Sequence, residues 1–114
     1  NPANQAFVKA FEQKYKRIPS QYAAQAYDSA LVIDSALTKT KGVASDKAAL
    51  RAAIKSADFQ SVRANFKFDT NGFPIQDLGV FQVAKDAQNR VSLKKIATPL
   101  PAHRNAYVGE CALK

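Results

Sequence analysis

SQYAAQAYDSALVIDSALTKT, residues 20–40, is the least polar stretch of this chain and the segment on which its fold depends. Apolar residues cover most of the circumference of a helix built from this run, whereas a surface helix would show one apolar stripe. Asp28, Ser29, Asp34 and Ser35 interrupt the run too often for a membrane-spanning helix. The sequence therefore predicts a buried helix that other segments surround.

The composition is that of a globular domain. The chain has 114 residues, of which 46% are hydrophobic and 23% charged, so it is long enough to bury a core and not polar enough to be disordered. It contains no methionine, which indicates a processed product or a fragment of a longer protein. A signal peptide would have been removed from a mature secreted protein, so the lack of one here does not argue for the cytoplasm.

The net charge of +8 has two interpretations. A basic domain can bind nucleic acid or another anionic surface. Alternatively, the charge is a solvated face, and this interpretation is favoured because the lysines and arginines are scattered, with only small groups at 14–17 and 94–95. The single cysteine, Cys111, indicates a partner outside the chain if the protein is secreted, or a free thiol if it is cytoplasmic.

Three helices are expected in the first half of the chain. Asn1 and Pro2 are typical of a helix start, and the apolar spacing that follows predicts an amphipathic helix of about four turns. Residues 20–26 are expected to include a short extended piece before the buried helix, which ends at Gly42. Asp46 then begins a third helix. Its inner stripe is Ala49, Leu50, Ala53 and Ile54.

Strands are expected in the second half. Apolar and polar residues alternate in 62–68, which predicts a half-buried strand closed by turn residues at 69–72. Residues 78–84 and 90–97 predict a hairpin, and residues 99–114 an extended tail. Helices thus precede strands without alternating with them. This order is more typical of the end of a larger α/β protein than of a self-contained domain.

No catalytic or metal-binding set can be assembled from the residues. His103 is the only histidine and lies in the expected tail, and one histidine with one cysteine does not supply a metal site. Asp28 and Asp34 are six residues apart and do not share a helical face, so a role for Asp28 at the helix dipole is the better explanation. We expect no catalytic residue, no metal and no cofactor, and therefore no enzyme.

A nucleic-acid stacking platform is the alternative to a core strand for Phe66 and Phe68. The alternation places both rings on one face and both cations, Arg63 and Lys67, on the other. A platform needs rings and cations presented together, so the core strand is the favoured interpretation and no nucleic acid partner is expected.

Tyr22 and Tyr27 lie at the entrance of the central helix. A tyrosine offers a flat apolar face and a hydroxyl group, which suit a pocket for a small amphipathic ligand. Both could equally be core tyrosines with satisfied hydroxyl groups. The residues alone leave these alternatives open.

Four motifs, taken in order, resemble a known family. They are NPANQAFVKAFEQKY (1–15), P-S-x-Y-A-A-x-A-Y-D (19–28), FDTNGFPIQD (68–77) and LGVFQVAKD (78–86). The chain from residue 1 to about 97 resembles the C-terminal part of type I periplasmic solute-binding proteins, the leucine/isoleucine/valine-binding-like receptors of ABC importers. This family has two α/β lobes joined by three crossovers, with the ligand in the cleft between them.

The resemblance implies a partial type I periplasmic binding protein fold of class α/β, with helices, a C-terminal β-hairpin and the remainder of both lobes missing from this chain. Residues 1–72 would be the second segment of the N-terminal lobe, and 73–77 the last crossover. Residues 78–98 would be the C-terminal segment of the other lobe, and 99–114 an extended tail.

The resemblance also assigns roles to three residues of the second motif. Tyr22 would face the cleft and pack against the ligand. Tyr27 is a second candidate ligand-binding residue, although it and Asp28 are expected to serve packing and helix-start roles. Many members have glycine before the F-x-F-D strand, where Ala64 and Asn65 stand here, so the local backbone should differ.

The function implied is that of an extracytoplasmic, periplasmic solute-binding component of an ABC transporter, which captures an amino acid or an aromatic carboxylate for import. PIQD (74–77) is similar to members that take aromatic acids, so Tyr22 could stack on a ring. The partners would be this ligand and a membrane permease, and the chain could self-associate through exposed core. Two alternatives stay open: a basic nucleic-acid-binding domain, and a cytoplasmic ligand sensor of the same fold.

Overall fold

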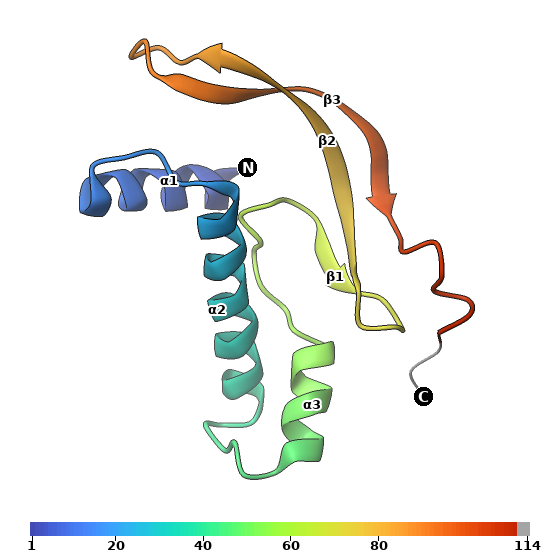
Figure 1. Ribbon diagram of the computed structural model, residues 1–114. Helices are drawn as coiled ribbons and strands as arrows, with labels where there is room; N and C mark the ends of the chain where they lie inside the picture. The colour runs from blue at the N-terminus through green and yellow to red at the C-terminus, as the bar shows by residue number, and fades with distance from the viewer. Residues whose placement is uncertain (112–114) are drawn as a thin grey trace.

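A computed structural model describes residues 1–111 as three helices followed by a three-stranded sheet (Figure 1). The helices are α1 (Pro2–Tyr15), α2 (Gln21–Lys39) and α3 (Lys47–Lys55), and the strands are β1 (Phe66–Phe68), β2 (Pro74–Lys85) and β3 (Val91–His103). None of the helices within residues 1–111 is long and apolar enough to cross a membrane.

Helix α1 begins as its sequence predicts. The Asn1 side chain accepts a hydrogen bond from the Asn4 N–H at 2.7 Å, and Pro2 occupies the first helical position. These two features satisfy one free N–H and remove another, which is why the chain enters the helix here. The helix ends at Tyr15, where Lys16 takes the left-handed conformation with φ 56°.

Helix α2 differs from the prediction in two ways. It begins at Gln21 with no extended piece, because the Ser20 hydroxyl accepts the Ala23 N–H at 3.3 Å and caps it. The helix is also not buried as a whole. Asp28 and Ala36 are its only buried residues, and Ile33 is 55% exposed. Within the described residues, α2 is covered only in part: α3 packs against it, Phe7 of α1 contacts Tyr27, and the loop before β1 covers Asp28.

Helix α3 confirms its predicted start and three of the four residues of its inner stripe, whereas Ala49 is exposed because it lies in the first turn. The Asp46 carboxylate accepts the Ala49 N–H at 3.0 Å, and Ala53 is buried, with Leu50 and Ile54 half-buried. Figure 1 places α3 beside the lower half of α2. The Lys39 ammonium at the end of α2 also donates a hydrogen bond to the carbonyl oxygen of Ser56, the residue that caps the end of α3.

The sheet is antiparallel with strand order β1-β2-β3. Strand β1 is shorter than the expected 62–68. Val62 lies in a buried turn and Ala64 has φ 80°, a left-handed conformation that breaks the strand before Phe66. The resemblance predicted that the local backbone would differ at Ala64 and Asn65, and here an alanine takes a positive φ.

The hairpin of β2 and β3 is confirmed but extends further than predicted. Its turn is closed by the Asp86 N–H, which donates to the Arg90 carbonyl at 2.9 Å. Strand β3 continues to His103, so the tail expected from residue 99 is wrong for its first five residues. Pro99 and Pro101 lie in this strand because β3 is at the edge of the sheet, where a missing N–H is tolerated.

The hairpin arches over α1 and is attached to the rest of the chain near its two ends (Figure 1). At its tip, the guanidinium of Arg90 lies 2.5 Å from the Glu12 carboxylate of α1. At its base, β1 pairs with β2, and Arg104 contacts Asp69. Between these ends its apolar side chains are exposed, as for Val83 at 69%.

Candidate functional site

Tyr22 is presented from the first turn of α2 and is 78% exposed. Among the described residues, no aromatic ring or cation contacts its ring. The backbone N–H groups of Gln21 and Tyr22 also have no hydrogen-bond acceptor within residues 1–111, because Ser20 caps Ala23 instead. An exposed aromatic face therefore lies beside two unpaired donors at the positive end of a helix, an arrangement that suits an anion.

Tyr27 has different surroundings. Its ring centroid lies 4.8 Å from that of Phe7 in α1 at a tilted angle, and the residue is 45% exposed. Tyr27 comes five positions after Tyr22, which places the two residues about 140° apart around the helix axis, so their side chains leave α2 in different directions. The packing role expected for Tyr27 is what these contacts describe.

Asp28 holds the middle of α2 to the loop before β1. It is 2% exposed and accepts hydrogen bonds from the Ser61 hydroxyl at 2.7 Å, the Val62 N–H at 2.9 Å and the Arg63 Nε–H at 2.8 Å. We call these four residues the Asp28 anchor. The helix-start role predicted for Asp28 is wrong, because α2 begins two turns earlier. A carboxylate within an apolar run was the available signal, since a buried charge requires partners.

The Asp28 anchor is extended on both sides. The Arg63 guanidinium donates to the Gln76 side chain of β2 at 3.3 Å. From α1, the side-chain amide of Asn1 donates to the Ser61 carbonyl at 3.1 Å, and that of Asn4 donates to the Val62 carbonyl at 3.0 Å. One loop thus fixes α1, α2 and the sheet relative to each other, and with them the direction in which Tyr22 points.

The aromatic residues around β1 form a packed cluster. Phe66 lies 5.1 Å from Phe68 and 5.5 Å from Phe59, measured between ring centroids. The prediction that the cations lie on the opposite face is wrong for Arg63, whose guanidinium carbon is 5.5 Å from the Phe66 ring centroid. Ala64, which follows Arg63, has φ 80° and interrupts the alternation on which that prediction rested. Phe66 and Phe68 are half-buried, as the core-strand interpretation requires.

A second buried carboxylate lies in the turn after β1. The Asp69 side chain is 2% exposed and accepts both arms of the Arg104 guanidinium, at 2.7 Å each. Hydrogen bonding from Arg104, supported by the Thr70 N–H, lowers the pKa of Asp69 to about 2. This bidentate pair ties the end of β3 to the β1–β2 turn.

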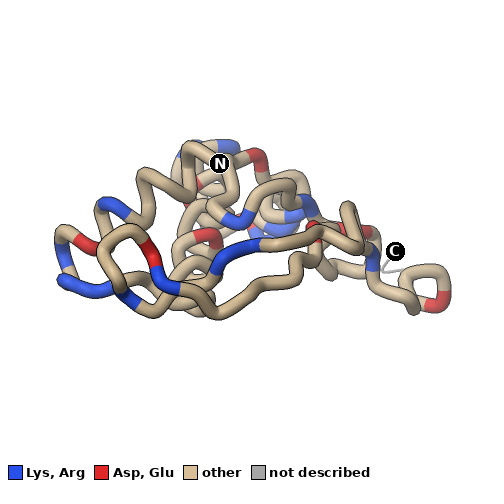
Figure 2. The backbone as a smooth tube through the Cα atoms, turned by 90° about the horizontal axis from the view of Figure 1, so that it is seen from above, with Lys and Arg blue, Asp and Glu red and all other residues tan. Residues whose placement is uncertain are grey.

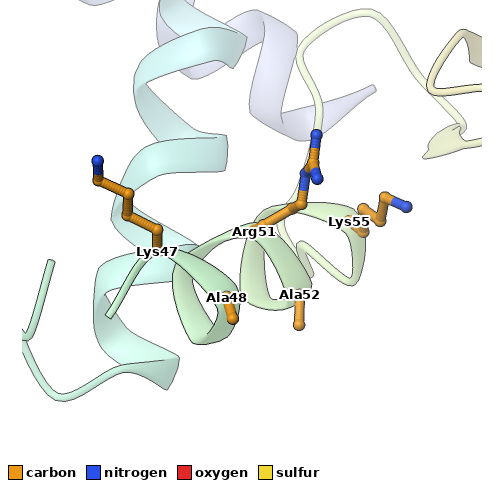
Figure 3. Close-up of a pocket in the computed structure, with 5 residues that line it drawn as sticks. All are labelled: Lys47, Ala48, Arg51, Ala52 and Lys55. Atoms are coloured by element: carbon orange, nitrogen blue, oxygen red, sulfur yellow. The ribbon is translucent and has the colours of Figure 1, made fainter. Parts of the chain in front are cut away.

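Two shallow hollows lie on the helices, and neither includes Tyr22 or Tyr27. One is on α1, around Val8 and Glu12. The other is on the outer face of α3 (Figure 3). Within residues 1–111, no three His, Cys, Asp or Glu side chains lie close enough to hold a metal ion. Cys111 is an exposed free thiol. Lys and Arg residues are spread over helices and hairpin without forming one block (Figure 2).

Comparison with known proteins gives consistent results. The model of a family described as periplasmic binding protein matches residues 1–88. An ABC transporter substrate-binding protein from Sphaerobacter thermophilus is similar in structure with a TM-score of 0.81 and 25% sequence identity, over 90% of this chain and 28% of that one. The solute-binding protein of an ABC transporter from R. palustris, in complex with benzoate, has a TM-score of 0.80 and 29% identity, over 96% of this chain and 29% of that one. No curated protein sequence matches. The chain thus spans less than a third of the length of these two structures.

Proposed function

This chain belongs to the type I periplasmic binding protein family, and from this premise we propose that it serves in the extracytoplasmic solute-binding component of an ABC importer. The observation that carries the proposal is the structural similarity to solute-binding proteins of ABC transporters over at least 90% of the chain. The partial α/β fold agrees with this, since three helices and a hairpin align with under a third of a complete receptor.

The ligand proposed is an aromatic carboxylate, with an amino acid as the alternative. Benzoate occupies the R. palustris relative. In this chain, the exposed ring of Tyr22 offers a face for stacking, and the free N–H groups of Gln21 and Tyr22 are suited to a carboxylate. Tyr27 would contribute indirectly, by packing α2 against α1 through Phe7.

The lobe assignment supports a ligand cleft beside the helices. Residues 1–72 would belong to the N-terminal lobe, 73–77 to the last crossover and 78–98 to the other lobe. The two partners would then be the small-molecule ligand and a membrane permease, and the location the periplasm. Cell fractionation tests the location, and recovery in the cytoplasm would favour the ligand sensor of the same fold instead.

Titration calorimetry on the full-length protein tests the ligand. Benzoate, an aliphatic amino acid and an aromatic amino acid are compared for the unaltered protein, Tyr22→Ala and Tyr22→Phe. Tyr22→Ala should weaken binding by roughly 1–3 kcal/mol through loss of a buried aromatic contact. The Phe variant should retain most of the affinity if stacking dominates.

Tyr107→Ala is the matched control, because Tyr107 is likewise an exposed tyrosine, at 66%, but lies beyond the sheet. The Tyr107→Ala variant should bind the ligand with the affinity of the unaltered protein. If Tyr22→Ala and Tyr107→Ala bind the ligand equally well, Tyr22 is not part of the binding site, and the proposed transport role is unaffected by this result. Failure of every carboxylate and amino acid to bind would contradict the proposed ligand class itself.

A further inference from the structure

The outward face of α3 carries three cations at a spacing of one helical turn. They are Lys47, Arg51 and Lys55, and Ala48 and Ala52 lie beside them, so that the five residues line a shallow hollow. Figure 3 shows the three long side chains extending away from the helix, while the two alanine methyl groups stay close to it. We call these five residues the α3 basic face.

This face is fixed in its orientation by the opposite side of the helix. Ala53 is buried, and Leu50 and Ile54 are half-buried where α3 packs on α2. The helix therefore cannot rotate its cations inward without exposing this stripe. The nearest acid in the sequence, Asp46, is used as the N-cap through its bond to the Ala49 N–H.

Three of the four other arginines of the described chain are paired with a carboxylate, and Arg17 is not. Arg63, Arg90 and Arg104 each form an ion pair with a carboxylate. Within residues 1–111, Lys47, Arg51 and Lys55 form none. Like charges one turn apart repel, and Lys47 also lies at the positive end of the helix dipole. The arrangement weakens an isolated helix, and an external anion would relieve it.

We propose that the α3 basic face docks a helix of a partner protein that carries carboxylates at the same four-residue spacing. Successive cations are about 6 Å apart along the axis, which is the spacing of acidic residues on one face of a facing helix. Ala48 and Ala52 allow the two backbones to approach closely. The face has no large apolar side chain, and surface helices that enter lipid use Trp, Phe or Leu for this purpose, so the geometry favours a protein over a membrane.

A fluorescent helical peptide with glutamate at three positions spaced by four is the probe, and the same peptide with glutamine is its control. Binding to the full-length protein is measured by anisotropy. The variant K47E/R51E/K55E is compared with K9E/K85E/K94E, which changes the net charge equally at scattered exposed sites. Loss of three exposed ion pairs should weaken binding of the glutamate peptide about tenfold in the first variant only. The charge-preserving variant K47R/R51K/K55R should retain binding.

Circular dichroism establishes that the variants fold, and K47Q/R51Q/K55Q replaces the charge reversal if that variant does not. Binding of the glutamate peptide should also weaken as salt is raised. If both charge-reversal variants lost the same affinity for the glutamate peptide, the effect would come from net charge alone, and the proposal would be overturned. So would the absence of peptide binding, or binding of vesicles containing anionic phospholipid in place of the peptide.

Discussion

Replacing Asp28 with alanine is the most informative perturbation of the fold. The substitution removes one buried carboxylate and leaves three donors without their acceptor: the Ser61 hydroxyl, the Val62 N–H and the Arg63 guanidinium. These donors lie in the loop that also holds α1 through Asn1. The loss should therefore reduce global stability and should not be confined to local fraying.

The magnitude follows from the burial of each partner. Breaking a buried ion pair by removing one partner costs about 3–5 kcal/mol, because the remaining charge is left unpaired. Here the Arg63 side chain is 27% exposed and keeps its bond to Gln76, so it can recover part of its hydration. The Val62 N–H and the Ser61 hydroxyl are buried and cannot. We expect about 3 kcal/mol for Asp28→Ala, and about 2 kcal/mol for Asp28→Asn, which keeps one acceptor oxygen.

Urea unfolding of the full-length protein measures this loss, with circular dichroism as the signal and the slope of the transition as a check on compactness. Asp34→Ala is the control, since it removes a carboxylate from the same helix at an exposed position and should cost less than about 0.5 kcal/mol. The argument that the Asp28 anchor stabilises the fold would be refuted if the two variants lost nearly the same free energy of unfolding. We take a difference of less than about 1 kcal/mol between Asp28→Ala and Asp34→Ala as that outcome, which is about twice the loss expected for the control.

Two further predictions concern acidic groups at element boundaries. Arg104 holds the pKa of Asp69 at about 2, against an ordinary 3.8, so the pair stabilises the fold above the unfolded pKa and this contribution is lost as the pH falls through the folded value. The stability difference between Arg104→Gln and the unaltered protein, measured by urea unfolding, should therefore shrink from about pH 7 to about pH 2, and a constant difference would contradict the pairing. Asp46→Ala should destabilise α3 by about 1 kcal/mol, whereas Asp46→Asn, which can still cap, should be nearly neutral in the same assay, and equal losses would argue against the cap.

The starts of α1 and α3 were predictable because their signals are local. Asn1 with Pro2, and Asp46, each place a side-chain acceptor within three residues of the N–H that it receives. The hairpin was predictable for the same reason, since Asp86 and Arg90 close its turn within five residues. Such features need no knowledge of the rest of the fold.

Some of the features that were missed depend on residues distant in the sequence, and others on the local backbone. The role of Asp28 requires partners more than 30 residues later. The break at Ala64 is invisible to a pattern with a period of two, because the pattern describes side chains and not φ. The exposure of α2 could not be predicted either, because hydrophobicity indicates that a surface is suited to burial but not which segment covers it. The candidate site is a further example: the motif proposes Tyr22, but the free N–H groups beside it depend on which residue Ser20 caps.

The prolines in β3 bear on how copies of this chain behave toward each other. An edge strand offers a row of backbone donors and acceptors to which a strand of a second molecule can pair, and repeated pairing produces an aggregate. The edge strand β3 also carries exposed apolar side chains, among them Val91 and Leu93. Pro99 and Pro101 remove two donors from that row, and Lys94 and Lys95 add charge beside it. The two prolines predicted to lie in an extended tail are thus suited to limit the addition of a further strand at this edge, and their replacement would leave its row of donors unbroken.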